Sequence, residues 1–442
     1  MGIDDLWKIL EPTFQTRSFR QLCIEEGFRA NRRNTGAVVI GVDASVWMVQ
    51  CQAVFWNPRH AQAGQNPELR TLFYKLAHLG ASGAVAVFVF DGAKRPSVKR
   101  NTKVIKKLHW LTAEFQKMIA LFGFYSYTAE GEAEAELAAL NRFRLIDLIL
   151  TSDNDVFVFG ATHMIRGCSG RNQDLYLEGD QRQTFSWDQV GRVSFDCATL
   201  RGDYDTVGLQ KCGIKIALGL IRCGFGDTLL AAAQTLSREA LPDFVATWRE
   251  EIRSELATNS RGYLPGKYRA LAGSIPSDFP DINIVFLYVQ PVTSWSNGGT
   301  APDSSKWIGR VPELPGLALY CATKFGWTSV EINSKFKKLL FDGIYFRRLL
   351  MPYSEIEILK AHVIHGRVNE EHPPLSASDS LAWLGPETMA QAWLHLAQAS
   401  KIPSQSRSQG SWPGLAWLGS SHGFVTGNPR KAFIRRLEVK NK

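Results

Sequence analysis

The sequence predicts an α/β protein in which a mostly parallel central sheet is flanked by helices, and three observations support this fold class. Residues 37–45 and 84–92 are short, nearly continuous apolar runs rich in Val and Phe, as expected of strands that are covered on both faces. Residues 146–153 repeat the pattern. Helix-like segments at 67–80 and 109–123 lie between these runs, and such alternation of strands and helices is typical of a parallel sheet.

Each of the three expected strands ends in an aspartate. These residues are Asp43, Asp91 and Asp153, and Asp155 follows two residues after the last of them. A single aspartate in such a position commonly caps the next helix or turn. The functional crevice of an open parallel sheet lies outside the carboxyl ends of its strands, so these carboxylates are expected in one place. Their repetition across three strands favours a shared site.

More acids come from the Ala-rich stretch TAEGEAEAELAALN, which reads as the start of a helix and carries Glu130, Glu132, Glu134 and Glu136. Acids near a helix N-terminus are favoured by the helix dipole, so their presence alone does not show a site. Residues two apart on a regular helix point to different sides. Glu132 and Glu134 could therefore act together only if the helix begins between them or the cleft wraps around its end.

Carboxylates gathered in one cleft predict a bound cation. They cannot all stay ionised unless their pKa values rise or a positive charge compensates them. Oxygen donors without His or Cys select hard ions, so Mg²⁺ or Mn²⁺ is expected rather than zinc. Two such ions about 3.5–4 Å apart suit the in-line displacement of a phosphodiester.

The chain is basic, with a net charge of +9 and a pI near 9.1, which suits a polyanionic partner. From 94 to 107 it has no acid and seven bases: Lys94, Arg95, Lys99, Arg100, Lys103, Lys106 and Lys107. Lys99, Lys103 and Lys106 are spaced to share one helical face, which could be a solvated surface. Because the run begins three residues after a strand-end aspartate, Lys94 and Arg95 are expected to reach a phosphate held on the metal ions.

Glycines punctuate short apolar pieces in LRGDYDTVGLQKCGIKIALGLIRCGFGD, residues 200–227, which predicts a helix-turn-helix pair. Such a pair offers backbone N–H groups and helix N-termini to phosphates without reading bases. The expected DNA contacts here are Gly208, Lys211, Gly213 and Lys215.

The organisation expected along the chain is a core over 1–292, a loop and helical extension over 293–352, and a C-terminal module over 353–442. One long helix is expected over 330–350. The seven cysteines include no C-x-x-C pair, which argues against a disulfide framework or a structural zinc. The first residues do not predict a signal peptide, and no apolar run approaches the roughly 20 residues of a membrane span, so no membrane partner is expected.

Six ordered segments, MGIDDLWKIL, GVDAS, FVFDGAKRP, GEAEAELA, TSDNDVFVFGA and GDYDTVGLQKCG, resemble the XPG-type structure-specific nucleases related to flap endonucleases. The resemblance covers roughly residues 1–350. It implies that the metal-binding acids are Asp43, Asp91, Glu132, Glu134, Asp153, Asp155 and Asp203. It also implies that Lys94 and Arg95 contact the scissile phosphate, and that the glycine-punctuated segment is a helix-two-turn-helix that grips duplex backbone and holds K⁺.

Within that family, the spacing resembles the Holliday-junction resolvase branch. Asp91 and Glu132 are only 41 residues apart (132 − 91), whereas flap endonucleases carry a longer, capped arch that takes a free 5′ end. The segments VPELPGLALYCATKFGW and FRRLL also resemble this branch, whose members carry a chromodomain-like module after the nuclease.

The hypothesis is a nuclear, Mg²⁺-dependent endonuclease that resolves four-way junctions by symmetrical paired nicks through two-metal-ion hydrolysis, in recombination and DNA repair. One active site per chain implies a monomer in solution and a dimer on the junction. A 5′-flap endonuclease and a non-catalytic DNA-structure-binding protein are the alternatives. An acid-rich phosphatase would leave the basic run and the glycine-punctuated pair unexplained.

Overall fold

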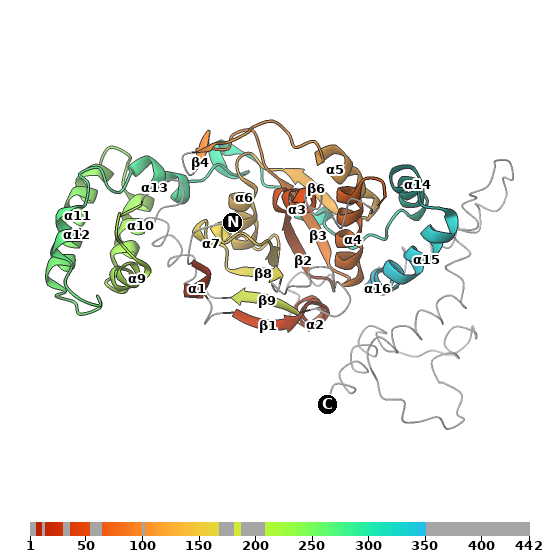
Figure 1. The fold of residues 1–442 in the computed structure, drawn as a ribbon, viewed down its shortest axis with the longest axis horizontal. Coiled ribbons are helices and arrows are strands. Elements are labelled where there is room, and N and C mark those ends of the chain that lie inside the picture. Colours follow the sequence, from red (N-terminus) through yellow and green to blue (C-terminus); the bar gives the residue numbers. More distant parts are fainter. Residues whose placement is uncertain are drawn as a thin grey trace, which may run out of the picture. The chain divides into compact units, whose positions relative to one another are not determined.

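The computed structural model describes residues 6–10, 14–29, 36–53, 64–99, 102–167, 181–186 and 208–350 (Figure 1). The chain divides into two compact units, 1–332 and 333–442. The expectations for Arg100, Asp203 and the module over 353–442 lie outside the described residues.

A seven-stranded sheet has the order β1-β9-β8-β7-β2-β3-β6. Its strands are β1 (Phe14–Ser18), β2 (Val39–Asp43), β3 (Val85–Phe90), β6 (Tyr125–Thr128), β7 (Leu148–Leu150), β8 (His163–Gly167) and β9 (Gln181–Ser186). The five strands β6, β3, β2, β7 and β8 run parallel, while β9 pairs antiparallel with both β8 and β1. The mostly parallel sheet is confirmed. Every residue of β2 and β3 is buried, which explains their continuous apolar sequence.

Helices cover both faces of the sheet (Figure 1). They are α3 (Ala44–Gln52), α4 (Pro67–Ala81), α5 (Thr112–Leu121), α6 (Ala133–Arg142) and α7 (Asp155–Val158). On one face, Phe88 of β3 packs against Trp47 of α3 and Phe115 of α5, with ring centroids 5.3 and 5.4 Å apart. On the other face, Gly41 of β2 leaves room for α6, because a Cβ there would lie 2.5 Å from the side chain of Leu137. Glycine at position 41 thus lets α6 pack closely against the sheet.

The first unit has further helices besides those that cover the sheet. They are α1 (Leu6–Leu10), α2 (Phe19–Ile24), a π-helix (Glu25–Arg29), α9 (Ile214–Arg222), α10 (Phe225–Thr235), α11 (Leu241–Thr258), α12 (Arg269–Gly273), α13 (Ile282–Val289) and α14 (Leu314–Phe325). Phe73 of α4 packs edge-on against Phe122 and Trp327, with centroids 5.4 and 5.3 Å away. No single described helix is long and apolar enough to cross a membrane; α9 and α10 meet that criterion only as a pair bent by 66°, by length and composition alone.

The single helix expected over 330–350 is wrong. The structure has α15 (Ser329–Leu339) and α16 (Phe341–Leu350), which are separated at Leu340. Asp342 lies in the first turn of α16, where an acid is favoured by the helix dipole, whereas the interior of one long helix would favour neither Asp342 nor Gly343.

Candidate active site

The strand ends bring the expected acids together. Asp43 is the last residue of β2, Asp91 follows β3, and Asp153 lies three residues after β7. Carboxylate oxygens of Glu134, Asp153 and Asp155 all lie within 4.8 Å of one another, and the described part of the chain holds one such group. A parallel sheet therefore delivers acids from separate strands to one place, as expected.

Asp43 has two structural roles. Its Oδ1 accepts a hydrogen bond from the backbone N–H of Val46 at 3.0 Å, so it caps α3 as well as ending β2. Its side chain is almost wholly buried, at 2% exposure. Burial, followed by the charges of Asp91 and Asp153, raises the pKa of Asp43 to about 7. The capping N–H of Val46 opposes this rise but does not cancel it.

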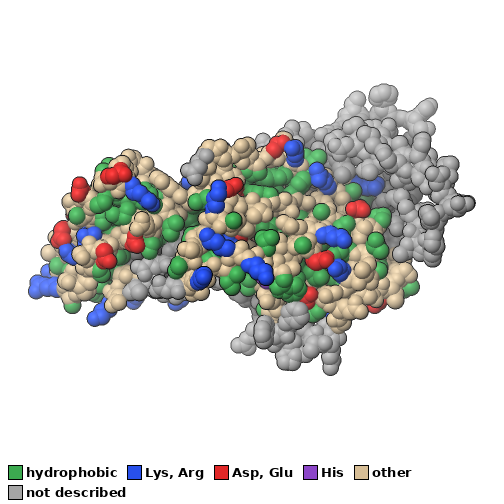
Figure 2. Space-filling model, turned by 90° about the horizontal axis from the view of Figure 1, so that it is seen from above, with side chains coloured by type: hydrophobic (Ala, Val, Ile, Leu, Met, Phe, Trp, Pro, Cys, Tyr) green, Lys and Arg blue, Asp and Glu red, His purple; other side chains and the backbone are tan. Residues whose placement is uncertain are grey.

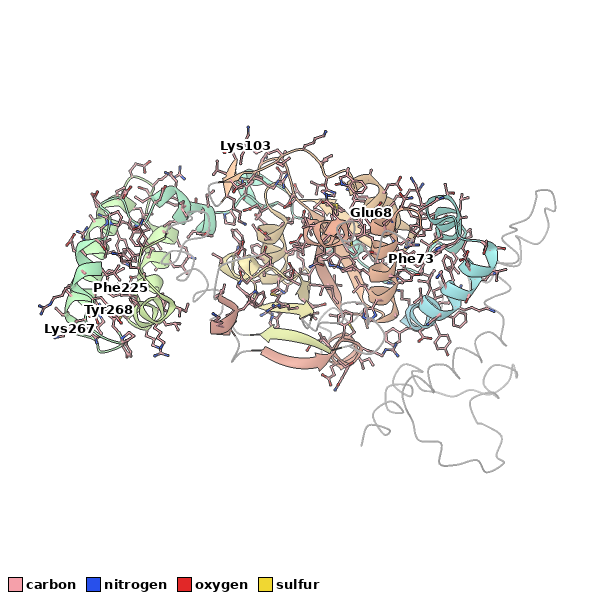
Figure 3. All side chains as sticks on the ribbon, in the orientation of Figure 1. Glu68, Phe73, Lys103, Phe225, Lys267 and Tyr268 are labelled. Carbon is pink, nitrogen blue, oxygen red and sulfur yellow. The ribbon has the colours of Figure 1, made fainter. Side chains whose placement is uncertain are left out.

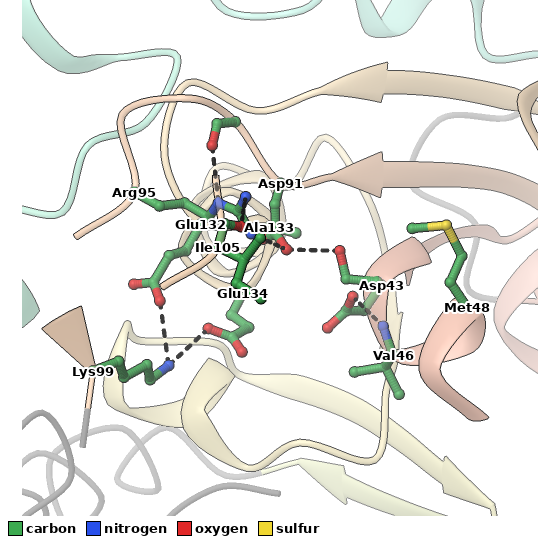
Figure 4. Close-up of polar contacts among 12 residues, drawn as sticks. Asp43, Val46, Met48, Asp91, Arg95, Lys99, Ile105, Glu132, Ala133 and Glu134 are labelled. Atoms are coloured by element: carbon green, nitrogen blue, oxygen red, sulfur yellow. Dashed lines mark hydrogen bonds and ion pairs between the residues drawn. The ribbon is translucent and has the colours of Figure 1, made fainter. Parts of the chain in front are cut away.

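Asp91 joins three segments of the chain through its carboxylate (Figure 4). Oδ2 accepts from Ser45 Oγ at 2.7 Å and from Arg95 Nη1 at 3.1 Å. Oδ1 accepts from the backbone N–H of Ala133, at the start of α6, at 3.0 Å. The helix that carries Glu134 is thus tied directly to the end of β3.

The loops after β3 and β6 run against each other beside Asp91. Gly92 N donates to Gly131 O at 2.7 Å, and Lys94 N donates to Glu130 O at 3.0 Å. A Cβ on Gly92 would lie 1.9 Å from the carbonyl oxygen of Ala129, a separation that no side chain can adopt. Glycine is required here because the two backbones approach closely, and this approach sets the position of Glu132.

Helix α6 begins between Glu132 and Glu134. Glu132 is the N-cap, with extended backbone angles, and Glu134 lies in the first turn. This is the arrangement that the spacing required if both were to face one cleft, and both carboxylates reach the same ammonium group (Figure 4).

The two flanking glutamates have other partners. Glu130 pairs with Lys94 at 2.7 Å. Buried Glu136 accepts from Tyr127 OH at 3.1 Å and from Ser294 N at 2.8 Å, so it supports the packing of α6.

Lys99 provides the positive charge at the acid cluster. Its Nζ lies 3.3 Å from Glu132 Oε1, 3.3 Å from Glu134 Oε2 and 3.1 Å from Asp155 Oδ2, and its side chain is 18% exposed. Burial raises the pKa of Glu134 well above its usual value; Lys99 lowers it, and the neighbouring carboxylates raise it further. The ammonium of Lys99 thus supplies positive charge at the place where the acids would bind a metal cation.

The basic run is not the helix that the spacing predicted. Strands β4 (Val98–Lys99) and β5 (Thr102–Lys103) form an antiparallel hairpin, with Lys99 opposite Thr102. The β-branched residues in this stretch favour strands, and the hairpin separates the three lysines that a helix would have aligned. Lys99 faces the acids, whereas the side chain of Lys103 is exposed and points away from the sheet (Figure 3).

The donor set fits a hard divalent cation. All of its members are carboxylates, several are buried, and a cationic group already lies among them. Mg²⁺ and Mn²⁺ prefer oxygen ligands of this kind. The residues brought together are Asp43, Asp91, Glu132, Glu134, Asp153 and Asp155.

The expected helix-turn-helix residues lie at the start of α9. Gly208 and Lys211 have positive φ angles of 46° and 64°, and Gly213 is the N-cap of α9. Lys211 and Lys215 are exposed on either side of this N-terminus. Backbone N–H groups and two lysines are thus presented together, as phosphate binding requires.

Two family domains match the sequence: the XPG N-terminal domain over residues 1–109 and the XPG I-region over 123–200. The DNA repair protein rad13 of Schizosaccharomyces pombe is 28% identical over 255 residues, which cover 56% of this chain and 21% of that protein. The human protein named Flap endonuclease GEN homolog 1 is 29% identical over 256 residues, covering 52% and 26%. The matched region therefore spans about a quarter or less of these curated relatives.

Solved structures are similar over more of the chain. The eukaryotic junction-resolving enzyme GEN-1 with caesium has a TM-score of 0.63 and 27% identity, covering 79% of this chain and 80% of that one. The Holliday junction-resolving enzyme GEN1 in complex with product DNA and Mg²⁺ has a TM-score of 0.61 and 26% identity, with the same coverage. Together, these matches show that the chain carries the XPG N-terminal and I-region domains and is similar to structure-specific nucleases of the XPG type.

Proposed function

We propose that this protein resolves four-way DNA junctions by two symmetrical nicks, in recombination and DNA repair in the nucleus. The observation that carries the proposal is the short connection between β3 and α5. Its described residues, 92–99 and 102–111, form one small hairpin and loops, with no helix that could cap an arch. A DNA strand without a free 5′ end could therefore reach the acids. Similarity to structures of junction-resolving enzymes supports the same substrate.

The acids would hold two divalent ions, Mg²⁺ or Mn²⁺. Their ligands would be Asp43, Asp91, Glu132, Glu134, Asp153 and Asp155, together with Asp203, which lies outside the described residues. Bound ions of this kind supply the charge that stabilises the attacking and leaving oxygens of phosphodiester hydrolysis. The chain itself fixes the ligands, through the cap at Asp43 and the three hydrogen bonds to Asp91.

We assign contact with the scissile phosphate to Lys99. Its ammonium lies among the carboxylates, so it is the base best placed to bind a phosphate oxygen once metal ions neutralise those acids. Arg95 positions Asp91, and Lys94 pairs with Glu130 on a more exposed side. The family resemblance linked these two residues to the scissile phosphate. We propose that they contact DNA at the edge of the acid cluster.

DNA backbone would be gripped at two further places. Lys103 of the hairpin is exposed, as are Lys106 and Lys107 after it, and Arg100, which lies outside the described residues, would contact the same backbone. Gly208, Lys211, Gly213 and Lys215 would bind phosphates of the duplex, with K⁺ held by backbone oxygens of this segment. Because the described part of the chain holds one acid cluster, two copies would assemble on a junction, each cutting one strand.

The test is nicking of end-labelled DNA by the purified chain with Mg²⁺. The substrates are an immobile four-way junction with blocked ends, a 5′ flap and a linear duplex. Asp153→Asn is compared with Asp303→Asn, which removes a carboxylate from an exposed site. We expect paired junction nicks that disappear only in Asp153→Asn. Cutting of the flap alone would indicate a flap endonuclease, and binding without cutting would indicate a DNA-structure-binding protein.

A further inference from the structure

A basic loop connects α11 to the start of α12. It comprises residues 259–269, in which Arg261, Lys267 and Arg269 are exposed. No acid occurs from residue 256 to residue 277, so this stretch of chain does not balance its own positive charge. Figure 2 shows Lys and Arg side chains projecting from the left end, where α11 and α12 lie. Exposed charges are common, so the rigidity and position of the basic loop decide whether it is a binding site.

Hydrogen bonds fix the shape of the basic loop. Asn259 has a positive φ of 53°, and its Nδ2 donates to the carbonyl oxygen of Leu264 at 3.0 Å. Its Oδ1 accepts from the backbone N–H of Leu264 at 3.1 Å. Near the other end of the loop, Tyr268 N donates to the carbonyl oxygen of Leu256 in α11 at 2.6 Å. A loop held in this way loses little conformational freedom when it binds a ligand.

Arg261 connects the basic loop to α9 and α10. Its backbone N–H donates to Oε1 of buried Glu255 at 3.1 Å. Its Nη1 donates to the carbonyl oxygen of Cys223, the C-cap of α9. Its guanidinium also lies over the ring of Phe225, the first residue of α10, 4.6 Å from the ring centroid. Arg261 therefore holds the loop in place, and the other two bases of the loop remain to meet a ligand.

The basic loop packs closely against α9. A Cβ on Gly219 would lie 2.8 Å from the side chain of Leu264 and 2.9 Å from the carbonyl oxygen of Tyr263, so glycine permits this close approach. Gly219 is six residues from Gly213, the N-cap of α9, and six residues of α-helix span about 9 Å. The loop is thus within reach of a duplex whose phosphates bind at the start of α9.

The exposed side chains of the basic loop suit a DNA backbone. Tyr263 is 52% exposed, Lys267 and Arg269 are exposed, and Lys267 points outward from the helices (Figure 3). Lysine, arginine and tyrosine side chains commonly contact the phosphates and sugars of duplex DNA. An acidic protein segment would satisfy the same charges, but the position of the loop on α9 favours DNA.

We propose that the basic loop binds the backbone of the duplex arm held at the start of α9, roughly three nucleotides from the phosphates bound there. The spacing follows from the distance along α9, because successive phosphates of one strand are about 3.4 Å apart along the duplex axis. The loop would extend the grip on the arm without reading its sequence. This inference rests on the proposed function, which supplies the duplex arm as its ligand.

The test variant is Lys267→Gln with Arg269→Gln, whose side chains are exposed, so little folding stability is at risk. The matched control is Lys337→Gln with Lys338→Gln, two exposed bases of α15 whose loss lowers the net charge equally. The full chain is titrated into a fluorescein-labelled four-way junction, with Ca²⁺ in place of Mg²⁺, and binding is followed by anisotropy from about 50 to 200 mM KCl. Further junctions carry one uncharged methylphosphonate at successive positions of an arm.

We expect the control to bind like the wild-type chain. The loop variant should bind at least about fivefold more weakly and lower the slope of log affinity against log salt by about 2, the loss of two phosphate contacts. At the phosphates that the loop contacts, methylphosphonate should weaken the wild type and leave the loop variant unchanged. These positions should lie roughly three nucleotides from those that lose their effect in Lys211→Gln with Lys215→Gln.

Wild-type affinity, salt slope and methylphosphonate pattern in the loop variant would overturn the inference. Equal weakening of the loop variant and the control would also overturn it, since net charge rather than a contact would then be responsible. Parallel nicking assays with Mg²⁺ separate the two proposals. Junction nicking by the wild type, with unchanged DNA binding by the loop variant, defeats this inference alone. Absence of nicking on every branched substrate defeats the proposed function, whereas the binding map still decides the role of the loop.

Discussion

Replacing Lys99 by methionine should tighten the binding of divalent cations while slowing hydrolysis. The ammonium makes three ion pairs with the acids at 3.1–3.3 Å, from a largely buried position. A pair of this kind contributes about 0.5–1 kcal/mol. A metal ion that displaces the ammonium therefore gives up roughly 1.5–3 kcal/mol, which corresponds to an affinity about 10- to 150-fold weaker than without Lys99.

The assay is titration of the DNA-free chain with Mn²⁺, with free Mn²⁺ measured by electron paramagnetic resonance at pH 8. Methionine keeps the length and apolar stem of the side chain. Lys103→Met is the matched control, because Lys103 lies on the paired strand of the same hairpin but is exposed. Its loss should change the affinity by about twofold or less, since solvent screens its charge. Unchanged or weaker Mn²⁺ binding by Lys99→Met would refute the competition between ammonium and metal.

Three further predictions concern stability. Because the pKa of buried Asp43 is raised from 3.8 to about 7, the metal-free fold should lose stability as pH rises from about 4 to 7, by up to roughly 4 kcal/mol from this group. Asp43→Asn keeps a helix cap, so its melting temperature at pH 8 should be higher than that of the wild type. This difference should narrow toward pH 4. Gly92→Ala should lower the free energy of unfolding in urea by about 3 kcal/mol or more because its Cβ meets the backbone of the neighbouring loop, whereas Gly266→Ala, which meets nothing within 4 Å, should stay within about 0.5 kcal/mol. Glu136→Gln should cost about 1–3 kcal/mol, since one of two hydrogen-bond donors loses its acceptor, and should leave Mn²⁺ affinity unchanged; weakened Mn²⁺ binding would place Glu136 in the metal site instead.

The sequence predicts the acid cluster well because the signals for it are local. Apolar runs mark β2, β3 and β7, and the aspartates stand at or just beyond their ends. The start of α6 between Glu132 and Glu134 also follows from the requirement that both face one cleft.

The position of Lys99, whose positive charge compensates the acids, could not be predicted from the sequence in the same way. Lys99, Lys103 and Lys106 have helical spacing, but pairing between Val98 and Lys103 turns the chain back after only two residues of strand. Strands this short carry no periodic signal, and their register depends on the neighbouring loops. Strands β1 and β9 are missed for a related reason, since FQTRS and QRQTFS are polar and lack the apolar run that marks a covered strand.

The hydrogen bonds of Asp91 decide how an inactive form of this protein is best made for trapping DNA. Removing that carboxylate would release Ser45, Arg95 and the first N–H of α6 together, so a failed reaction could reflect a displaced helix as easily as a lost ligand. The described bond accepted by Asp153 is local, from the backbone N–H of Asp155 at 3.2 Å, and asparagine can preserve it. Complexes prepared with Asp153→Asn would therefore keep the geometry of the productive state.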